Sequence, residues 1–361
     1  MPVIRAVTIH LDHHPLDPGL ENRVEEVYSR MKKAAGRLGL EVWTFRLSLP
    51  VLERIDHNII ADVSGKLSRM AVKHNLLISG LNIDNPRTSI IREIVDALTI
   101  TNNVYASILV GGLEDLKPYA DVLYERTRSW QVFTRLALVF PERPLTPYFP
   151  ASTTINGREG FTIALRYVDL VREAVSGGNE DHITEYFRRI EQTGRRLEEE
   201  TGLDYLGTDI SLSPWMEESV GELVEYINNK PLPEPGTAWA INWLETYIED
   251  KASEAGLTTT GFNQIMLAVG EDNLLKQRAI EGRLRLRDLA ILSAYCVAGV
   301  DMAAFSIAET SRHDLLRILH DTYTASKVKN KPLGIRLIPT LQSRGSLLRD
   351  ERFDKIPVLY P

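Results

Sequence analysis

Short runs of β-favouring residues alternate with longer segments of helical periodicity along almost the whole chain. The first run, residues 3–11, is rich in valine and isoleucine, and a helical pattern over residues 21–38 follows it. The same alternation continues to residue 339. It predicts ten strands, at residues 3–11, 41–49, 76–83, 104–112, 135–141, 160–166, 205–213, 261–269, 300–307 and 333–339.

Strands that alternate with helices are typical of α/β proteins with a largely parallel sheet and helices outside. Ten strands are too many for an eight-stranded barrel, and an open doubly wound sheet is the other architecture that fits. We expect one domain over residues 1–340, with halves at about 1–141 and 158–340. The proline-rich segment between the halves is interpreted either as a lid or as a simple connection. Residues 341–361 are expected to form an exposed C-terminal extension.

The composition excludes several classes of function. The formal net charge is -7 and the pI about 5.7, whereas a nucleic-acid binder needs a basic surface, so no nucleic acid is expected. The single cysteine, Cys296, permits neither an intramolecular disulfide nor a cysteine-based zinc site. Its apolar neighbours indicate a buried, inert thiol. We expect no signal peptide and no membrane span, and hence a cytoplasmic protein. Sparse glutamine and many ion-pairing residues are also typical of thermophiles.

Three segments of the second half resemble a known family. They are Thr-Gly-Leu-Asp-Tyr-Leu-Gly-Thr-Asp-Ile-Ser-Leu-Ser-Pro at 201–214, Gly-Phe-Asn-Gln at 261–264, and Tyr-Cys-Val-Ala-Gly-Val-Asp-Met at 295–302, which is followed by Arg-Leu-Ile-Pro at 336–339. These segments and their spacing resemble the family called domain of unknown function 711, over roughly residues 130–340. The N-terminal third resembles it through its opening strand.

The resemblance implies a fold similar to that of the glycyl-radical enzymes, which include pyruvate formate-lyase. That fold is a ten-stranded α/β barrel of two five-stranded halves, and it implies a homodimer by analogy. Those enzymes carry their radical on a glycine near the C-terminus, in an Arg-Val-x-Gly-aromatic context. Here Gly334 lies in Pro-Leu-Gly-Ile and Gly345 in Ser-Arg-Gly-Ser. We therefore expect the fold without the radical.

A cluster of polar side chains, His10, Asp12 and His13, lies at the end of the first predicted strand. Imidazole and carboxylate groups at short spacing can bind zinc, iron or manganese, and His10 could instead act as a general base. The alternative is a polar loop with exposed histidines. The glycine-rich turns at 111–112 and 176–178 form no nucleotide-binding motif. A divalent metal is therefore the one cofactor that the sequence suggests.

Two aspartates are candidates for catalysis. Asp209 interrupts an apolar run, and Ser211 lies on the same face of the predicted strand and could contact a substrate. In a barrel interior such a carboxylate could act as a general base, or it could cap a helix or pair with a buried arginine. Asp301 follows Gly299 and is a second candidate, with a turn or cap role as its alternative.

Three further residues are candidates for binding a substrate. Asn263 and Gln264 interrupt a strand-like run, where their amides could orient a polar ligand or satisfy backbone groups at a bulge. Arg336 lies on the last predicted strand and could clamp a carboxylate or phosphate. The alternative for Arg336 is an ion pair with Asp209 or Asp301.

Three functions are compatible with these residues. The leading hypothesis is a non-radical enzyme that acts on a small anionic metabolite in the barrel interior, which requires Asp209, Asn263, Asp301 and His10 to converge. The second is a non-catalytic protein that binds a small molecule, which predicts a polar pocket without an acid–base pair. The third is an assembly protein, which predicts an apolar interior and a large exposed patch.

Overall fold

The computed structural model describes residues 3–361 except 54, 85, 156 and 180. Within this part of the chain, eight strands form one sheet in the order β11-β5-β4-β3-β2-β1-β6-β7. Their bounds are β1 (Val3–His10), β2 (Glu41–Ser48), β3 (Leu77–Ile83), β4 (Val104–Leu109), β5 (Leu136–Phe140), β6 (Gly160–Leu165), β7 (Tyr205–Asp209) and β11 (Leu333–Ile335).

Two smaller sheets complete the strand layer. One has the order β12-β10-β14-β13 and the other pairs β8 with β9. Their bounds are β8 (Met266–Ala268), β9 (Ala298–Asp301), β10 (Ala303–Ser306), β12 (Leu337–Thr340), β13 (Leu347–Asp350) and β14 (Asp354–Leu359).

Strand direction divides the chain into two halves. Strands β1 to β5 are parallel to one another, whereas β6 runs antiparallel to β1 and β11 runs antiparallel to β5. Strand β7 is parallel to β6, and an isolated bridge from Thr208 to Thr259 extends this half towards β8. The prediction of an α/β protein is therefore confirmed, and its sheets curl into half-barrels around a common interior.

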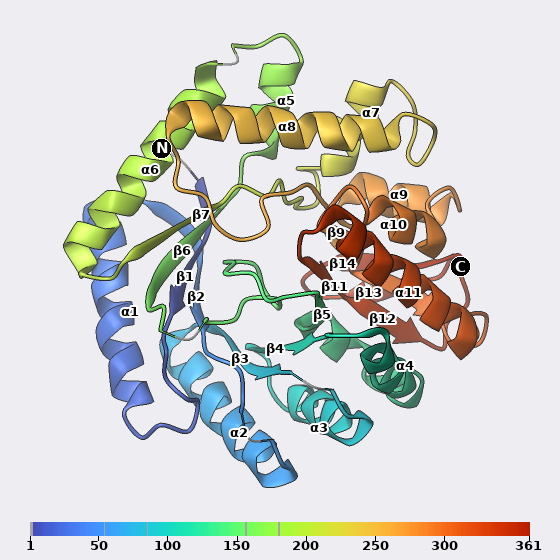
Figure 1. The fold of residues 1–361 in the computed structure, drawn as a ribbon, viewed down its shortest axis with the longest axis horizontal. Coiled ribbons are helices and arrows are strands. Elements are labelled where there is room, and N and C mark those ends of the chain that lie inside the picture. The colour runs from blue at the N-terminus through green and yellow to red at the C-terminus, as the bar shows by residue number, and fades with distance from the viewer. Residues whose placement is uncertain (1–2, 54, 85, 156, 180) are drawn as a thin grey trace.

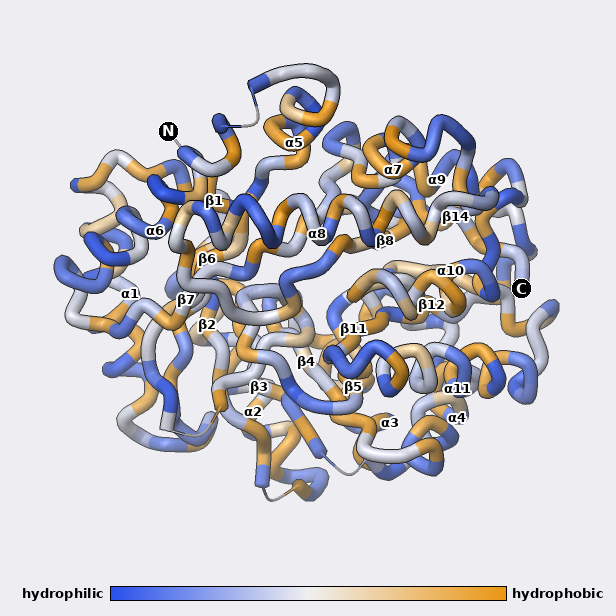
Figure 2. The backbone as a smooth tube through the Cα atoms, turned by 45° about the horizontal axis from the view of Figure 1, so that its top comes forward, coloured by the Kyte–Doolittle hydropathy of each residue, from blue (hydrophilic) through white to orange (hydrophobic). Residues whose placement is uncertain are grey.

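The helices lie outside the curled sheets (Figure 1). Helix α1 shows why, because Leu20, Val24, Val27 and Met31 recur every three or four residues and are all buried. The colouring of Figure 2 shows the same alternation of apolar and polar positions along the other helices. In the described part of the chain no helix has the length and apolarity that a bilayer crossing requires.

Eleven α-helices are described in this outer layer. Their bounds are α1 (Leu20–Arg37), α2 (His57–His74), α3 (Thr88–Thr99), α4 (Leu116–Glu125), α5 (Val168–Val175), α6 (Asp181–Thr201), α7 (Val220–Asn228), α8 (Thr237–Ala255), α9 (Asn273–Ile280), α10 (Leu286–Leu292) and α11 (Arg312–Lys329).

The proline-rich connection between the halves runs through the interior, where Figure 1 shows it as a green segment in the middle of the molecule. We call residues 144–154 the lumen loop; all but Phe149 are buried. The hydroxyl of Thr8 donates to the carbonyl of Pro147 (3.1 Å), and that of Thr154 donates to the carbonyl of Ser48 (2.7 Å). Bonds to the strands thus satisfy polar groups of the loop. The segment is thus a connection between the halves whose course is buried.

Two β-bulges turn charged side chains towards the interior. Between the pairs Ile4–Leu165 and Ala6–Ala164, strand β1 contains one residue more than β6, and that residue is Arg5. Strand β9 likewise contains one residue more than β8 before Asp301. A bulge changes which face of a strand the following side chains occupy, and bulges are frequent beside functional sites.

The C-terminal segment differs from the exposed extension that the sequence predicts. Strands β13 and β14 form an antiparallel hairpin, and β14 runs parallel to β10. Leu348 of β13 and residues 356–359 of β14 are buried in this arrangement, because β14 lies inside the small sheet, between β10 and β13. The tip at residues 351–352 and the positions 347 and 349 of β13 meet solvent.

Candidate functional site

A cavity of about 910 Å³ opens at one end of the half-barrels. It lies towards the amino ends of the parallel strands β2 to β5 and is also lined by residues of β8, β9 and β11. We call it the ionic cavity, because six arginines and four carboxylates line it, namely Arg5, Arg46, Arg135, Arg336, Arg349, Arg352, Glu271, Asp301, Asp350 and Glu351.

Four of these side chains form a continuous chain of ion pairs. Arg336 binds Asp301 through two nitrogens, with distances of 2.7 Å and 2.6 Å, and its Nη2 also donates to Glu271 (2.9 Å). The other oxygen of Glu271 accepts from Nη2 of Arg5 at 3.0 Å. All four side chains are at most 10% exposed. Bidentate pairing of this kind fixes the side chains in one geometry.

Burial and charge act in opposite directions on the two carboxylates of this chain. Burial alone would raise the pKa of Glu271, but the positive charges of Arg336 and Arg5 outweigh burial and lower it. Burial raises the pKa of Asp301, although Arg336 opposes the shift. The arginines therefore favour the ionised form of Glu271, whereas burial favours the protonated form of Asp301.

We call the part of the cavity around the ion-pair chain and Arg46 the inner cavity. Arg46 is its one arginine without a carboxylate partner among the described residues. Its Nε donates to Thr44 (3.0 Å), its Nη1 donates to the carbonyl of Pro147 (3.1 Å), and the guanidinium lies 5.3 Å from the ring centre of Phe149. Burial, aided by the charge of Arg5, lowers the pKa of Arg46 to about 10. Arg46 remains charged at neutral pH.

The charges of the inner cavity do not balance. Arg5, Arg46 and Arg336 face Glu271 and Asp301, so one positive charge is left over in a buried site. An uncompensated buried charge is costly unless a counter-ion occupies the site. The inner cavity is thus electrostatically complementary to an anion.

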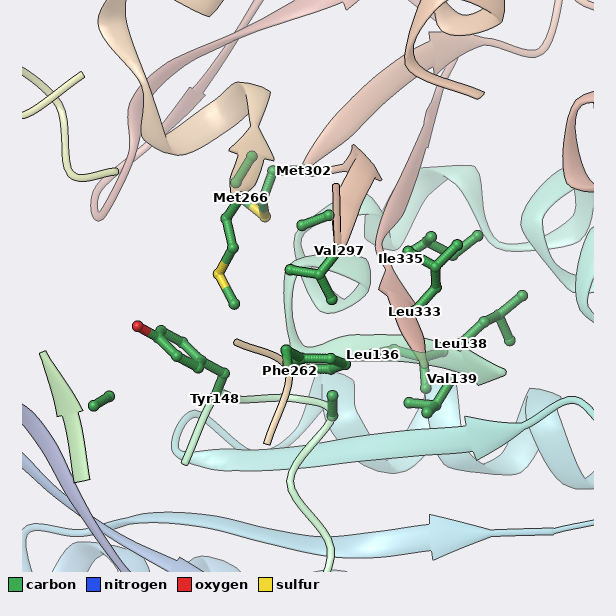
Figure 3. Close-up of a cluster of buried hydrophobic side chains, with 14 of the residues drawn as sticks. Leu136, Leu138, Val139, Tyr148, Phe262, Met266, Val297, Met302, Leu333 and Ile335 are labelled. Carbon is green, nitrogen blue, oxygen red and sulfur yellow. The ribbon is translucent and has the colours of Figure 1, made fainter. Parts of the chain in front are cut away.

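Aromatic and apolar side chains form the remaining walls. Tyr148, Phe262, Met266 and Val297 line the cavity, and Figure 3 shows how these four side chains lie relative to one another. The guanidinium of Arg5 lies 5.6 Å from the ring centres of both Trp43 and Trp215. A few fixed charges within apolar walls are the usual composition of a small-molecule pocket.

The tip of the C-terminal hairpin, residues 349–353, closes the outer side of the cavity. Nη2 of Arg352 donates to the hydroxyl of Thr134 at 2.6 Å. Nearby, Arg135 donates to the carbonyls of Leu98 (2.6 Å) and Val104 (3.1 Å), and so binds the carboxyl end of α3. The hairpin tip therefore adds a second charged group of residues to the site.

Of the predicted site residues, Asp301 and Arg336 line the cavity and contact each other. Their contact is the ion pair that the sequence left open as the alternative for Arg336. Arg5, Arg46 and Glu271 were missed. Each arginine interrupts an apolar strand pattern, at 3–11 and at 41–49, which is the signal that could have identified them.

Asp209 lies outside the cavity and acts as a structural centre. Its carboxylate accepts five hydrogen bonds, from the amides of Ser211, Phe262 and Asn263 and from the hydroxyls of Ser211 and Thr146. Burial raises the pKa of Asp209 and these bonds oppose the shift. Asp209 therefore ties β7 to the lumen loop and to the segment before β8.

Asn263 and Gln264 also make contacts within the fold. Oδ1 of Asn263 accepts from the amide of Ile210 at 3.0 Å, and the residue has a positive φ of 52°. The side-chain oxygen of Gln264 accepts from Lys329 at 3.0 Å, and its nitrogen lies 3.4 Å from Glu245. Neither residue lines the ionic cavity. Asn263 thus satisfies a backbone group, as in the structural alternative, whereas the side chain of Gln264 contacts two charged side chains.

The structure does not support the metal site predicted at His10, Asp12 and His13. His10 is fully buried with Nε2 2.9 Å from Thr162, Asp12 accepts from the amide of Gly157, and His13 lies 3.1 Å from Glu159. No group of three or more His, Cys, Asp or Glu side chains in the described ranges is arranged to hold a metal. The alternation of side chains in β1 turns His10 into the interior and separates it from the other two.

The buried His10 predicts a pH dependence of stability. Burial lowers its pKa from 6.5 to about 3, so between these pH values the unfolded chain binds a proton that the folded chain does not. The free energy of unfolding should therefore fall as the pH decreases from 6.5 towards 3, by at most about 1.4 kcal/mol per pH unit from this group. Urea unfolding at several pH values should show a shallower fall in His10→Gln than in the wild type. The exposed His313→Gln serves as control, and equal slopes in His10→Gln and wild type would contradict the prediction.

Cys296 is buried, as expected from its apolar neighbours. Its thiol donates to the carbonyl of Leu292 at 3.1 Å, and burial raises its pKa to about 12. At neutral pH it is protonated and therefore a poor nucleophile. The predicted burial of this thiol is confirmed.

These features define a mixed α/β protein with a positively charged cavity in the interior of its curled sheets. The model of the family described as "Uncharacterised ACR (DUF711)" matches residues 4–346. The chain belongs to this family, which confirms the resemblance carried by the motifs of its second half.

Relatives that match most of the chain are named UPF0210 protein. Identity is 24% to that of Sulfurisphaera tokodaii, over 96% of this chain and 86% of the relative. It is 22% to that of Pyrobaculum arsenaticum, over 99% of this chain and 92% of the relative. A UPF0210 protein of Methanopyrus kandleri is 30% identical over 41% of this chain and 33% of its own length. These names state no activity.

Proposed function

We propose that the protein binds a small anionic metabolite in the ionic cavity. The observation that carries this proposal is Arg46, a buried guanidinium that no carboxylate of the described residues neutralises. It lies beside an ion-pair chain that already satisfies Glu271 and Asp301. A carboxylate or phosphate bound at Arg46 would complete the charge balance of the site.

The geometry favours binding over the two other hypotheses. Of Asp209, Asn263, Asp301 and His10, which the enzyme hypothesis requires to converge, only Asp301 lines the cavity. An assembly protein should have an apolar interior, whereas ten charged side chains line this cavity. A polar pocket without a recognisable acid–base pair is what a binding protein predicts.

Replacing Arg46 with methionine tests the proposal. We expect the affinity of the purified protein for carboxylate probes such as glutarate to fall at least about tenfold in isothermal titration, because a charge-assisted hydrogen bond is lost. Without ligand, the melting temperature should stay the same or rise, because an unpaired buried charge is removed. Arg287→Met, an exposed change on α10, is the matched control. Unchanged affinity in Arg46→Met would refute the proposal.

A second candidate function is catalysis without a radical, with Asp301 as the general base. One observation favours it: Asp301 lines the cavity and burial raises its pKa. The test is to incubate the protein with the anion that co-purifies with it and to follow conversion by NMR. Asp301→Asn should abolish conversion and retain binding. The proposal fails if the variant converts the ligand as fast as the wild type.

We further propose that the two half-barrels form one closed barrel of ten strands, related to the glycyl-radical enzymes and assembled as a cytoplasmic homodimer. The antiparallel junctions β1–β6 and β5–β11 support closure. A hydrogen bond of 3.4 Å from the amide of Gly334 to the carbonyl of Val297 supports it on the side of β11. A crystal structure tests the barrel, and light scattering tests the dimer by its mass.

A further inference from the structure

The positive charge of the ionic cavity is divided between two clusters. The inner cluster contains Arg5, Arg46 and Arg336 against Glu271 and Asp301. The outer cluster contains Arg135, Arg349 and Arg352 against Asp350 and Glu351. Each has three guanidinium groups and two carboxylates, so each carries one positive charge in excess. The whole chain has a formal charge of -7. The positive charge of the two clusters therefore does not follow from the overall composition.

The two clusters lie on either side of Tyr105. Arg46 belongs to β2, Tyr105 to β4, and Arg135 directly precedes β5, in a sheet with the order β5-β4-β3-β2. Both arginines interact electrostatically with Tyr105. Three strand spacings separate the backbones of β2 and β5, or about 14 Å. Long arginine side chains shorten this span, but the clusters are too far apart to share one carboxylate.

The segment between the clusters is aromatic. The rings of Tyr105 and Phe149 meet edge to face at 5.2 Å between centres, and Phe149 lies under the guanidinium of Arg46. An apolar middle section between two cationic ends favours a ligand whose anionic groups are linked by an uncharged body. A cavity of about 910 Å³ is also far larger than a two- or three-carbon monoanion needs.

We infer that the ligand of the ionic cavity carries two anionic groups, one bound at Arg46 and the other at Arg352 and Arg349 of the C-terminal hairpin. This inference rests on the proposed function and specifies its ligand class. The shared chemistry is a pair of carboxylate or phosphate groups joined by an uncharged linker. The hairpin thereby becomes part of the binding site, with Arg352 already oriented by its bond to Thr134 (2.6 Å) and by an ion pair between its Nε and Asp350 (3.6 Å).

Paired probes test the inference by isothermal titration at low ionic strength. Succinate, glutarate, adipate and suberate are each compared with the monocarboxylate of the same chain length, and 3-phosphonopropionate tells whether phosphate is preferred at one end. We expect the best dianion to bind at least about tenfold more tightly than its monoanion. Its affinity should also fall more steeply with added NaCl, since more charge is neutralised on binding.

Variants distinguish this inference from the proposed function. In Arg349→Gln/Arg352→Gln the preference for dianions should disappear while monoanions bind as before, whereas Arg46→Met should weaken both classes. Arg287→Gln is the control, and circular dichroism verifies folding. Equal affinities of the wild type for dianions and monoanions, or a preference that survives the double substitution, would overturn the inference and leave anion binding at Arg46 intact. If no probe binds the wild type, the proposed function falls together with it.

Discussion

Arg336→Met is expected to lower the free energy of unfolding by about 3–5 kcal/mol, because it leaves Asp301 and Glu271 buried without their shared partner. Arg5 still neutralises part of the charge of Glu271, but Asp301 keeps no cation in contact among the described ion pairs. Urea unfolding at pH 7 measures the change. A further consequence is that the loss should shrink at pH values where Asp301 can be protonated.

The triple variant Asp301→Asn/Glu271→Gln/Arg336→Met provides the matched control. It removes Arg336 together with both of its carboxylate partners at nearly constant volume and leaves Arg5 bonded to the carbonyl of Pro214, so much of the stability lost in Arg336→Met should return. If the single and triple variants are equally unstable, the loss comes from packing and not from uncompensated charge, and the electrostatic account of the cavity is wrong.

Asp209→Ala is expected to cost about 4 kcal/mol or more, since three amides and two hydroxyls lose their acceptor in a site closed to solvent. The backbone of Gly261 packs directly against the Asp209 carboxylate, where a β-carbon would overlap it, so the alanine variant also leaves a void in a closely packed site. Calorimetry and urea unfolding measure the loss.

Two further variants serve as comparisons for the stability loss in Asp209→Ala: Asp209→Asn at the same position and Asp204→Ala at an exposed one. The asparagine retains one oxygen acceptor but presents an amide nitrogen to donors, so its loss should be intermediate. Asp204 is an exposed carboxylate five residues earlier in the chain, and its removal should change stability by no more than about 0.5 kcal/mol. A mild Asp209→Ala would show that the network is not a structural centre.

The α/β class and most strand positions could be predicted because burial leaves a direct trace in the alternation of apolar residues. Strands β1, β2 and β6 begin and end within two residues of their predicted bounds. The predicted strand 300–307 is in fact two strands in different sheets, separated at Met302, whose φ is 48°. Periodicity cannot show this break, because the apolar residues on both sides of it are buried.

Two of the charged residues of the candidate site could be predicted from the sequence, and the others could not, because the strand pairing that brings them together is not visible in the sequence. Asp301 and Arg336 attract notice as charges in apolar runs, and they pair in the structure. Arg5 lies at a bulge, where β1 contains one residue more than β6. Such a bulge depends on how the two strands pair, and the sequence of neither strand alone predicts that pairing. Asp209 has the same sequence signal as Asp301 but faces five protein donors and no cavity.

The buried course of residues 144–154 reverses the usual rule for dividing a protein into complementing fragments. A connection between two halves is normally the place where a chain tolerates a nick. Here a break would free the lumen loop, which fills the interior and makes hydrogen bonds to Ser48 and Thr8. Fragments that reassemble should instead be made by cutting the chain at the turn around Gly177, which is exposed and lies between α5 and α6. The best division point therefore lies after β6, and not in the segment that connects the two halves.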